Sequence, residues 1–371
     1  MIILEEALVR LTSSLIQMES TTPERINYAV EFCASWLQRH GVPVRLWENQ
    51  GLKMITATIG QANAGSTLVL NGHLDVVPGH TENFIPRVEA GRLHGRGSYD
   101  MLGAVAAMMA LIADLVQQPP KGRIILQLVP DEEKGGELGS AYLVEQGSIG
   151  DFVICGEPTN LDIAVQAKGV LQVKVEFSGI SAHGSRPWLG KNAIVAAMQK
   201  YNQLATLDFM KESSRFFPAP SFNLAKIEGG AALNQVPDRC SLYLDIRYLP
   251  TQNPGDILES IRQAVPDAHV EMLRHGSPVT TDACNPYVQT LQQSTAHIFG
   301  RETVLFGQDG SADTRFFAQY GIPAVEFGPI GANHHGPDEY VEIESLVLYQ
   351  KILRSFIKQL EGKVNRDEIE K

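Results

Sequence analysis

The sequence has few cysteines and no cysteine motif. Its four cysteines lie far apart, and none of them forms a CxxC pair: Cys33, Cys155, Cys240 and Cys284. This spacing argues against a zinc finger and indicates no disulfide framework. We therefore expect reduced thiols with a structural role.

Basic charge is also scarce. The 371 residues include 31 Lys and Arg against 42 Asp and Glu, which gives a net charge of −11. Binding to nucleic acid or to an anionic membrane requires a basic surface that displaces counterions. The composition therefore argues against nucleic acid and membrane partners and favours a small-molecule partner.

Long apolar runs are missing as well. The N-terminus has no basic segment, and Leu4, Leu8, Leu11 and Leu15 recur along one face of a predicted helix, unlike a signal peptide. The longest apolar run, residues 101–116, is shorter than the roughly 20 residues that span a bilayer, and it contains Asp114. We expect a buried core helix there, no membrane segment and a cytoplasmic protein.

The chain is long enough for two domains, since single cores seldom grow past roughly 250 to 300 residues. Short apolar runs at residues 68–70, 124–129 and 152–155 alternate with helical patterns, which is typical of an α/β fold with a mostly parallel sheet. This pattern returns after residue 277. We predict an α/β domain formed by residues 1–169 and 277–371, with helices flanking its central sheet.

The middle of the chain has a different pattern. Residues 171–177 and 241–246 alternate apolar and polar side chains, as in a sheet with one solvated face, and a helical pattern over residues 192–204 lies between them. We predict an inserted α+β domain over residues 170–276.

Polar residues follow the predicted strands, at the end of the sheet where α/β proteins build their sites. His73 and Asp75 come after the first apolar run, and the two-residue spacing puts them on one side of the chain. A carboxylate so placed can orient the imidazole of a metal ligand. The alternative is a structural or chance HxD pair.

Acidic residues recur at the same positions. Asp100 begins the core helix, Asp131, Glu132 and Glu133 follow the strand at residues 124–129, and Glu157 follows the strand at residues 152–155. The alternatives are a helix N-cap for Asp100 and a solvated turn for the three consecutive acids. However, carboxylates gathered at one end of a buried sheet repel one another and are costly to desolvate, which a bound cation would relieve.

Two adjacent histidines, His334 and His335, add imidazoles near the C-terminus. The predicted ligands then mix nitrogen and oxygen atoms: His73, Asp100, Glu133, Glu157 and His335. A carboxylate shared by two ions roughly 3.5 to 4 Å apart is typical of a co-catalytic zinc site. Because cysteine is absent from this set, cobalt or manganese could substitute for zinc.

At these residues the sequence resembles the family of dizinc metallopeptidases that contains acetylornithine deacetylase, succinyl-diaminopimelate desuccinylase, aminoacylase and glutamate carboxypeptidase. The resemblance covers nearly the whole chain. Its motifs stand in the family order: Gly72-His73-Leu74-Asp75, Gly95-Arg96-Gly97 with Asp100-Met101, Asp131-Glu132-Glu133, Gly156-Glu157-Pro158-Thr159 and His335-Gly336-Pro337-Asp338-Glu339-Tyr340.

The resemblance implies two divalent metal ions and a role for each matching residue. His73 and Glu157 would bind one ion, Glu133 and His335 the other, and Asp100 would bridge them. Asp75 would orient His73. Glu132 would be the general base that takes a proton from the metal-bridging water and passes it to the departing amine.

The inserted domain also resembles its counterpart in the family, a lid that forms a homodimer. His183 would stabilise the oxyanion in the partner's active site; its alternative is a surface histidine. Asn234, Arg247, Gly310 and Ser311 would lie near the substrate, and a surface arginine at a strand edge is the alternative for Arg247. Lys168 stands where desuccinylases carry an arginine that reads the succinyl carboxylate, which disfavours that activity.

The resemblance thus implies an amidohydrolase that cleaves N-acyl amino acids or small peptides with a free carboxylate. Two alternatives belong to other classes. A non-catalytic metal-binding relative would have no need of Glu132. A metal-dependent phosphoesterase is disfavoured because the sequence has no glycine-rich phosphate loop with an adjacent lysine.

Overall fold

The computed structural model describes residues 2–61 and 65–369, which fold into two compact units. The larger unit contains the described residues up to Val165, the segment Thr280–Phe306 and the residues from Ala312 onward. The smaller unit contains Gln166–Val279 together with the short segment Gly307–Ser311. The chain therefore passes from one unit to the other at 165/166, 279/280, 306/307 and 311/312, whereas the predicted insertion spans 170–276.

The larger unit is built around a mixed sheet. Its strands are β1 (Val44–Asn49), β2 (Leu52–Gly60), β3 (Thr67–His73), β6 (Arg123–Val129), β7 (Phe152–Cys155), β8 (Ile163–Ala167), β13 (Val279–Thr280), β14 (Leu305–Gln308) and β15 (Ala324–Glu326). The division of the chain into units falls within β8, β13 and β14. The order is β1-β2-β6-β3-β7-β15-β8-β13, with β14 also paired to β8. The four central strands β6, β3, β7 and β15 run parallel. Strands β1 and β2 are antiparallel to their neighbours, and β8 is antiparallel to β15. The predicted α/β class with a largely parallel core is confirmed.

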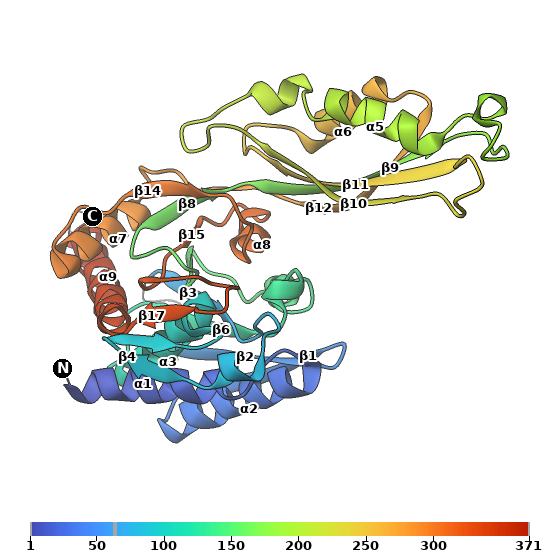
Figure 1. The fold of residues 1–371 in the computed structure, drawn as a ribbon. Helices are drawn as coiled ribbons and strands as arrows, with labels where there is room; N and C mark the ends of the chain where they lie inside the picture. Colours follow the sequence, from blue (N-terminus) through green and yellow to red (C-terminus); the bar gives the residue numbers. More distant parts are fainter. Residues whose placement is uncertain (1, 62–64, 370–371) are drawn as a thin grey trace. The chain divides into compact units, whose positions relative to one another are not determined.

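Helices cover both faces of this sheet (Figure 1). They are α1 (Ile2–Ile16), α2 (Pro23–Arg39), α3 (Gly103–Leu115), α4 (Ser140–Glu145), α7 (Pro286–Phe299), α8 (Thr314–Ala318) and α9 (Ile343–Ile369). Helices α1, α3, α7 and α9 pack on one another, while α4 and α8 pack over Val69, Ile125 and Val153. Among the described residues, one stretch, Ser98–Leu115, is long and apolar enough to cross a membrane, but 83% of it is buried inside the protein, as in a core helix.

Local sequence explains where several helices begin. Thr22, Asn253 and Asn285 precede Pro23, Pro254 and Pro286, respectively, and each side chain accepts a hydrogen bond from a backbone N–H of the first turn. This placement satisfies a free N–H group at the helix start, and proline fits the first helical position because its missing N–H would have no partner there.

A small second sheet in the larger unit joins two distant segments. Its strands are β4 (Arg87–Glu89), β5 (Arg92–His94), β16 (Gly331–Ala332) and β17 (Tyr340–Glu342), in the order β16-β17-β5-β4. Strands β5 and β17 are antiparallel, with His94 opposite Tyr340. The residues that follow β5 and those that precede β17 therefore leave the sheet at the same end.

The smaller unit is an antiparallel sheet covered by two helices. Its strands β9 (Gly169–Ser178), β10 (Ser221–Gly229), β11 (Arg239–Tyr248) and β12 (Ala268–Gly276) have the order β10-β11-β9-β12. Helices α5 (Ala193–Leu204) and α6 (Pro254–Ala264) lie along one face of this sheet (Figure 1). The buried core joins Val173, Val175 and Leu244 of the strands to Ala197 and Ile261 of the helices. This is the α+β pattern that the alternating sequence predicts.

Short helical turns complete the fold. They are η2 (Thr81–Phe84), η3 (Ser98–Leu102), η4 (Glu132–Lys134), η5 (Pro187–Leu189) and η6 (Asp208–Lys211). Two of them, η3 and η4, carry acidic residues of the predicted site. Asp100 has non-helical backbone angles within η3, and α3 begins after it at Gly103, so Asp100 is not the N-cap of the core helix.

Candidate metal centre

The parallel strands bring three of the predicted ligands together. His73 is the last residue of β3, and it pairs with Val129 at the end of β6 on one side. On the other side, Asn71 of β3 pairs with Cys155, the last residue of β7. Glu133 and Glu157 follow β6 and β7, so their side chains leave the sheet at the same end as His73.

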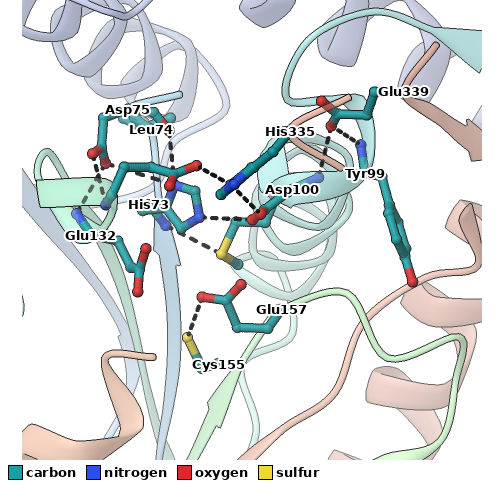
Figure 2. Close-up of polar contacts among 12 residues, drawn as sticks. His73, Leu74, Asp75, Tyr99, Asp100, Glu132, Cys155, Glu157, His335 and Glu339 are labelled. Carbon is teal, nitrogen blue, oxygen red and sulfur yellow. Dashed lines mark hydrogen bonds and ion pairs between the residues drawn. The ribbon is translucent and has the colours of Figure 1, made fainter. Parts of the chain in front are cut away.

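Asp100 contacts both histidines of the predicted set (Figure 2). Its Oδ1 atom lies 3.1 Å from His73 Nε2, and its Oδ2 atom lies 3.2 Å from His335 Nε2. His335 Nε2 is also 3.0 Å from Glu133 Oε1. Ligand atoms of His73, Asp100 and Glu133 all lie within 4.8 Å of one another. Asp100 therefore has the position of a bridging carboxylate.

Two further carboxylates, those of Glu132 and Glu157, lie beside His73 (Figure 2). Burial raises the pKa of both groups well above the usual range, and the charge of Asp100 adds to this effect. The Sγ atom of Cys155 lies 3.6 Å from Glu157 Oε1. Burial thus disfavours the ionised form of these carboxyl groups, and a divalent cation bound beside them would favour the ionised form.

Neighbouring carboxylates raise the pKa values of the two imidazoles, those of His73 and His335. For His335, hydrogen bonds with Asp100 and Glu133 raise the pKa to about 10. For His73, burial works to lower the pKa, but the hydrogen bond with Asp100 and the charge of Glu157 outweigh it, so the pKa is raised well above its usual value. Two imidazole nitrogens and several carboxylate oxygens at contact distance fit the N/O ligand set of a zinc-type site.

The structure also distinguishes between the two adjacent histidines. His335 has a positive φ of 62°, and its ring turns toward Asp100 and Glu133. The ring of His334 instead makes an edge contact with Tyr99, with 5.9 Å between the ring centroids. His335, rather than His334, therefore lies against Asp100 and Glu133 of the predicted ligand set.

Asp75 contacts His73 in a different way from the one predicted. His73 Nδ1 lies 2.8 Å from the backbone carbonyl oxygen of Asp75, whereas the nearer carboxylate oxygen is 3.7 Å away, beyond hydrogen-bond distance. The Asp75 carboxylate instead accepts hydrogen bonds from the backbone N–H groups of Glu132 at 3.2 Å and Glu133 at 3.1 Å. It therefore holds the turn that carries two site residues, and burial raises its pKa to about 7.

A buried ion pair to which no sequence pattern assigns a role lies beside the site. Arg96 Nη1 donates to Glu339 Oε2 at 2.8 Å, and both side chains are nearly inaccessible to solvent. Both residues lie within the motifs that carry the resemblance, but 243 positions separate them, so the sequence offers no signal that they touch.

The remaining predicted residues belong to the smaller unit. His183 is exposed, with its Nδ1 atom 2.8 Å from Ser185 Oγ, and Gly184 N–H donates to the exposed Asn234 at its carbonyl oxygen. Arg247 Nε donates to Asp245 Oδ1 at 2.7 Å, so its guanidinium has a carboxylate partner within the sheet. Gly310 and Ser311 fall in the segment grouped with this unit.

A mixed N/O cluster at the carboxyl ends of parallel strands, with one carboxylate between two imidazoles, defines a metallohydrolase of the dinuclear type. The sequence model of peptidase family M20/M25/M40 matches residues 69–359. The chain belongs to this family, whose members are dinuclear metal peptidases and amidohydrolases.

Individual relatives support the assignment. The chain is 30% identical to the succinyl-diaminopimelate desuccinylase of Marinobacter nauticus, over 95% of this chain and 98% of that protein. Its fold is similar to that of an aminopeptidase from Bacillus cereus, with a TM-score of 0.81, 20% identity and coverage of 96% and 98% of the two chains. A dinuclear metal-binding peptidase from Bacillus subtilis has a TM-score of 0.71 at 16% identity, with coverage of 95% and 97%.

Proposed function

We propose that this protein hydrolyses the amide bond of N-acyl amino acids or small peptides that carry a free carboxylate, with two divalent metal ions. The strongest support is the position of Asp100, whose two oxygens lie 3.1 and 3.2 Å from the Nε2 atoms of His73 and His335. His73 and Glu157 would hold one ion, and Glu133 and His335 the other. Zinc suits these ligands, and cobalt or manganese would be accepted.

The residues of the chain supply the proton transfer. When bound, divalent ions supply Lewis acidity to the scissile carbonyl and to a water molecule. Glu132 takes up the proton of that water and delivers it to the departing amine, as a general base and then a general acid. Asp75 fixes the position of Glu132 by accepting its backbone N–H.

The substrate class rests on the relatives and on the charges of the smaller unit. Similarity to desuccinylases favours an acylated amino acid with a carboxylate. Against a succinyl group stands Lys168, whose buried ammonium group already pairs with Asp309 at 2.8 Å. Arg247 and Asn234 are proposed to bind the substrate carboxylate, for which Arg247 would exchange its contact with Asp245.

The smaller unit is proposed to act as the lid and as the dimerisation domain. In this proposal His183 stabilises the oxyanion in the partner's active site, and Gly310 and Ser311 line the substrate. The exposure of His183 is compatible with that role. A cytoplasmic location is also proposed, because the N-terminal leucines Leu4, Leu8, Leu11 and Leu15 have helical spacing, unlike a signal peptide.

The test is hydrolysis of a panel by metal-free protein, with and without zinc, cobalt or manganese. The panel contains N-acetyl amino acids, N-succinyl-diaminopimelate and simple dipeptides, and p-nitrophenyl phosphate tests for a phosphoesterase. We expect metal-dependent turnover of at least one amide and none of the phosphate ester. Turnover that survives exhaustive chelation would exclude the metal mechanism. Bound metal with no turnover of any amide would favour a non-catalytic relative.

A further inference from the structure

The buried pair Arg96 and Glu339 connects the two loops that carry the metal ligands Asp100 and His335. Glu339 is 2% exposed and Arg96 is 5% exposed. Burying two charges is costly, and a buried ion pair adds little net stability compared with apolar side chains of the same size. A role in fold stability alone is therefore a weak explanation for this pair.

Glu339 fixes the backbone at Asp100. Its Oε1 atom accepts hydrogen bonds from the backbone N–H groups of Tyr99 and Asp100, both at 3.1 Å (Figure 2). Asp100 has non-helical backbone angles inside the turn η3, so these hydrogen bonds fix a stretch of backbone that departs from a regular helix. Hydrogen bonds accepted by a carboxylate are among the stronger ones in proteins. Here they fix the backbone of Asp100 and therefore the position of its side chain.

Arg96 fixes the other loop. Its Nη1 atom donates to Glu339, and its Nη2 atom donates to the backbone carbonyl oxygen of His335 at 3.2 Å. His335 has a positive φ of 62°, a conformation that a non-glycine residue rarely adopts unless its surroundings hold it there. The planar guanidinium group spans the two acceptors in a way that a lysine ammonium group does not match.

The small sheet brings this pair together. Because His94 of β5 lies opposite Tyr340 of β17, Arg96 follows one strand and Glu339 precedes the other at the same end. The Gly95 N–H also donates to the backbone carbonyl oxygen of Glu339 at 3.1 Å. The backbone contacts place the loops side by side, and the ion pair sets how closely Asp100 and His335 approach each other.

We propose that Arg96 and Glu339 are positioning residues that hold Asp100 and His335 at the separation needed to bind two divalent ions. The proposal rests on the metal-binding roles given to these residues above. Groups that orient metal ligands without touching the ion typically contribute 10- to 100-fold to metal affinity, roughly the effect expected here.

The test is calorimetric titration of metal-free protein with Zn²⁺, and with Co²⁺ for its visible spectrum. Glu339→Gln keeps the shape of the side chain but replaces one carboxylate oxygen with an NH₂ group and makes the other a weaker acceptor. One of these groups then faces Arg96, and the other faces the backbone N–H groups of Tyr99 and Asp100. We expect its Kd for at least one ion to rise about 10- to 100-fold and its Co²⁺ spectrum to change. Arg96→Lys keeps the charge but cannot bond Glu339 and His335 in the same planar geometry, so we expect a smaller rise in Kd.

Matched controls come from an ion pair in the same unit that lies away from the site. Arg354 Nη2 donates to Asp114 at 2.7 Å on partly exposed side chains. Asp114→Asn and Arg354→Lys remove the same groups as Glu339→Gln and Arg96→Lys, and we expect Kd to stay within twofold of the parent. The melting temperature of each metal-free variant reports structural damage separately from metal affinity.

The outcomes separate the two proposals. A parent protein that binds no Zn²⁺ or Co²⁺ would refute the proposed function itself. A parent that binds two ions, with folded Glu339→Gln and Arg96→Lys binding them equally well, would overturn the positioning role. If both variants fail to fold without metal while the controls fold, the pair is structural, and the positioning role is likewise overturned.

Discussion

The Nδ1 atom of His73 lies 2.8 Å from the backbone carbonyl oxygen of Asp75, not within hydrogen-bond distance of its carboxylate. The HxD spacing therefore serves two purposes at once. The backbone of Asp75 orients the imidazole, which leaves the carboxylate free to accept the N–H groups of Glu132 and Glu133.

Substitution of Asp75 should therefore act through the turn that carries Glu132 and Glu133. Asp75→Asn keeps one acceptor but replaces the other with an NH₂ group that faces an N–H donor. We expect kcat to fall about 10- to 100-fold, in line with other groups that support metal ligands. Asp162→Asn is the control, since Asp162 also accepts a backbone N–H, that of Val304 at 2.9 Å, away from the site. Steady-state kinetics with saturating metal measures both, and full activity of Asp75→Asn would contradict this role.

Alanine substitution of the adjacent acids Glu132 and Glu133 should have different effects on activity and on metal binding. Glu132→Ala removes the proposed base but no ligand, so we expect two ions per subunit and a kcat about 10²- to 10⁴-fold lower. Glu133→Ala removes a proposed ligand, whose Oε1 atom lies 3.0 Å from His335 Nε2, so we expect weaker metal binding. Metal content after dialysis, measured with kcat, separates the two. Parental activity in Glu132→Ala would remove Glu132 from the mechanism.

The path of the chain after this turn depends on a glycine. Gly136 has a φ of +71°, and an added Cβ would lie 2.1 Å from Asp313 Oδ1 and 2.7 Å from Phe316 Cε2. Gly147 has a similar φ of +79°, but nothing lies within 4 Å of its Cβ position. Both Ala variants carry backbone strain of about 1 kcal/mol, but only Gly136→Ala must also displace its neighbours.

We therefore expect Gly147→Ala to keep parental activity and to lose about 1 kcal/mol of unfolding free energy. Gly136→Ala should lose more stability and at least about tenfold in kcat, because the turn with Glu132 shifts. Urea denaturation and steady-state kinetics provide the comparison. Equal behaviour of the two variants would show that crowding at Gly136 has no consequence for the site.

The cysteines offer a test of the core. Cys33, Cys155 and Cys240 are buried, whereas Cys284 is exposed, and all four are free thiols. Burial raises the pKa of the Cys33 and Cys155 thiols, so little reactive thiolate forms at pH 8. We expect a thiol reagent to modify Cys284 quickly in the native protein and all four cysteines after denaturation. Cys284→Ser should abolish the fast phase; its persistence would show that a buried thiol is accessible.

The sequence predicts those parts of the fold whose signal is local. The buried strands β3, β6 and β7 appear as apolar runs because both faces of a parallel sheet are covered. Strand β4 has three exposed residues, and β16 has only two residues, so neither produces an apolar pattern. The small sheet that pairs β5 with β17 is consequently not predictable from hydrophobic periodicity.

The same distinction applies to the site. His73, Asp100, Glu133 and His335 can be found because each stands in a short motif of chemically suited residues. Which atom of Asp75 contacts His73, and that Arg96 contacts Glu339 across 243 positions, depend on tertiary geometry. The grouping of Gly307–Ser311 with the smaller unit similarly depends on contacts such as Lys168 with Asp309.

The proposed role of His183 in the partner's active site can be tested by mixing two inactive variants. His183→Ala keeps Glu132, and Glu132→Ala keeps His183. If each site combines Glu132 of one subunit with His183 of the other, a hybrid dimer has one complete site and one that lacks both groups. Random exchange makes half of the dimers hybrids, so we expect about a quarter of the parental activity.

His183 is exposed and its Nδ1 atom lies 2.8 Å from Ser185 Oγ, so we expect His183→Ala to fold like the parent. Ser185→Ala is a useful companion, since it removes the hydroxyl group 2.8 Å from Nδ1 and should lower kcat more than it changes KM. Subunit exchange is verified with differently tagged chains. With exchange verified, activity no higher than the sum of the two variants would mean that Glu132 and His183 do not combine across a dimer.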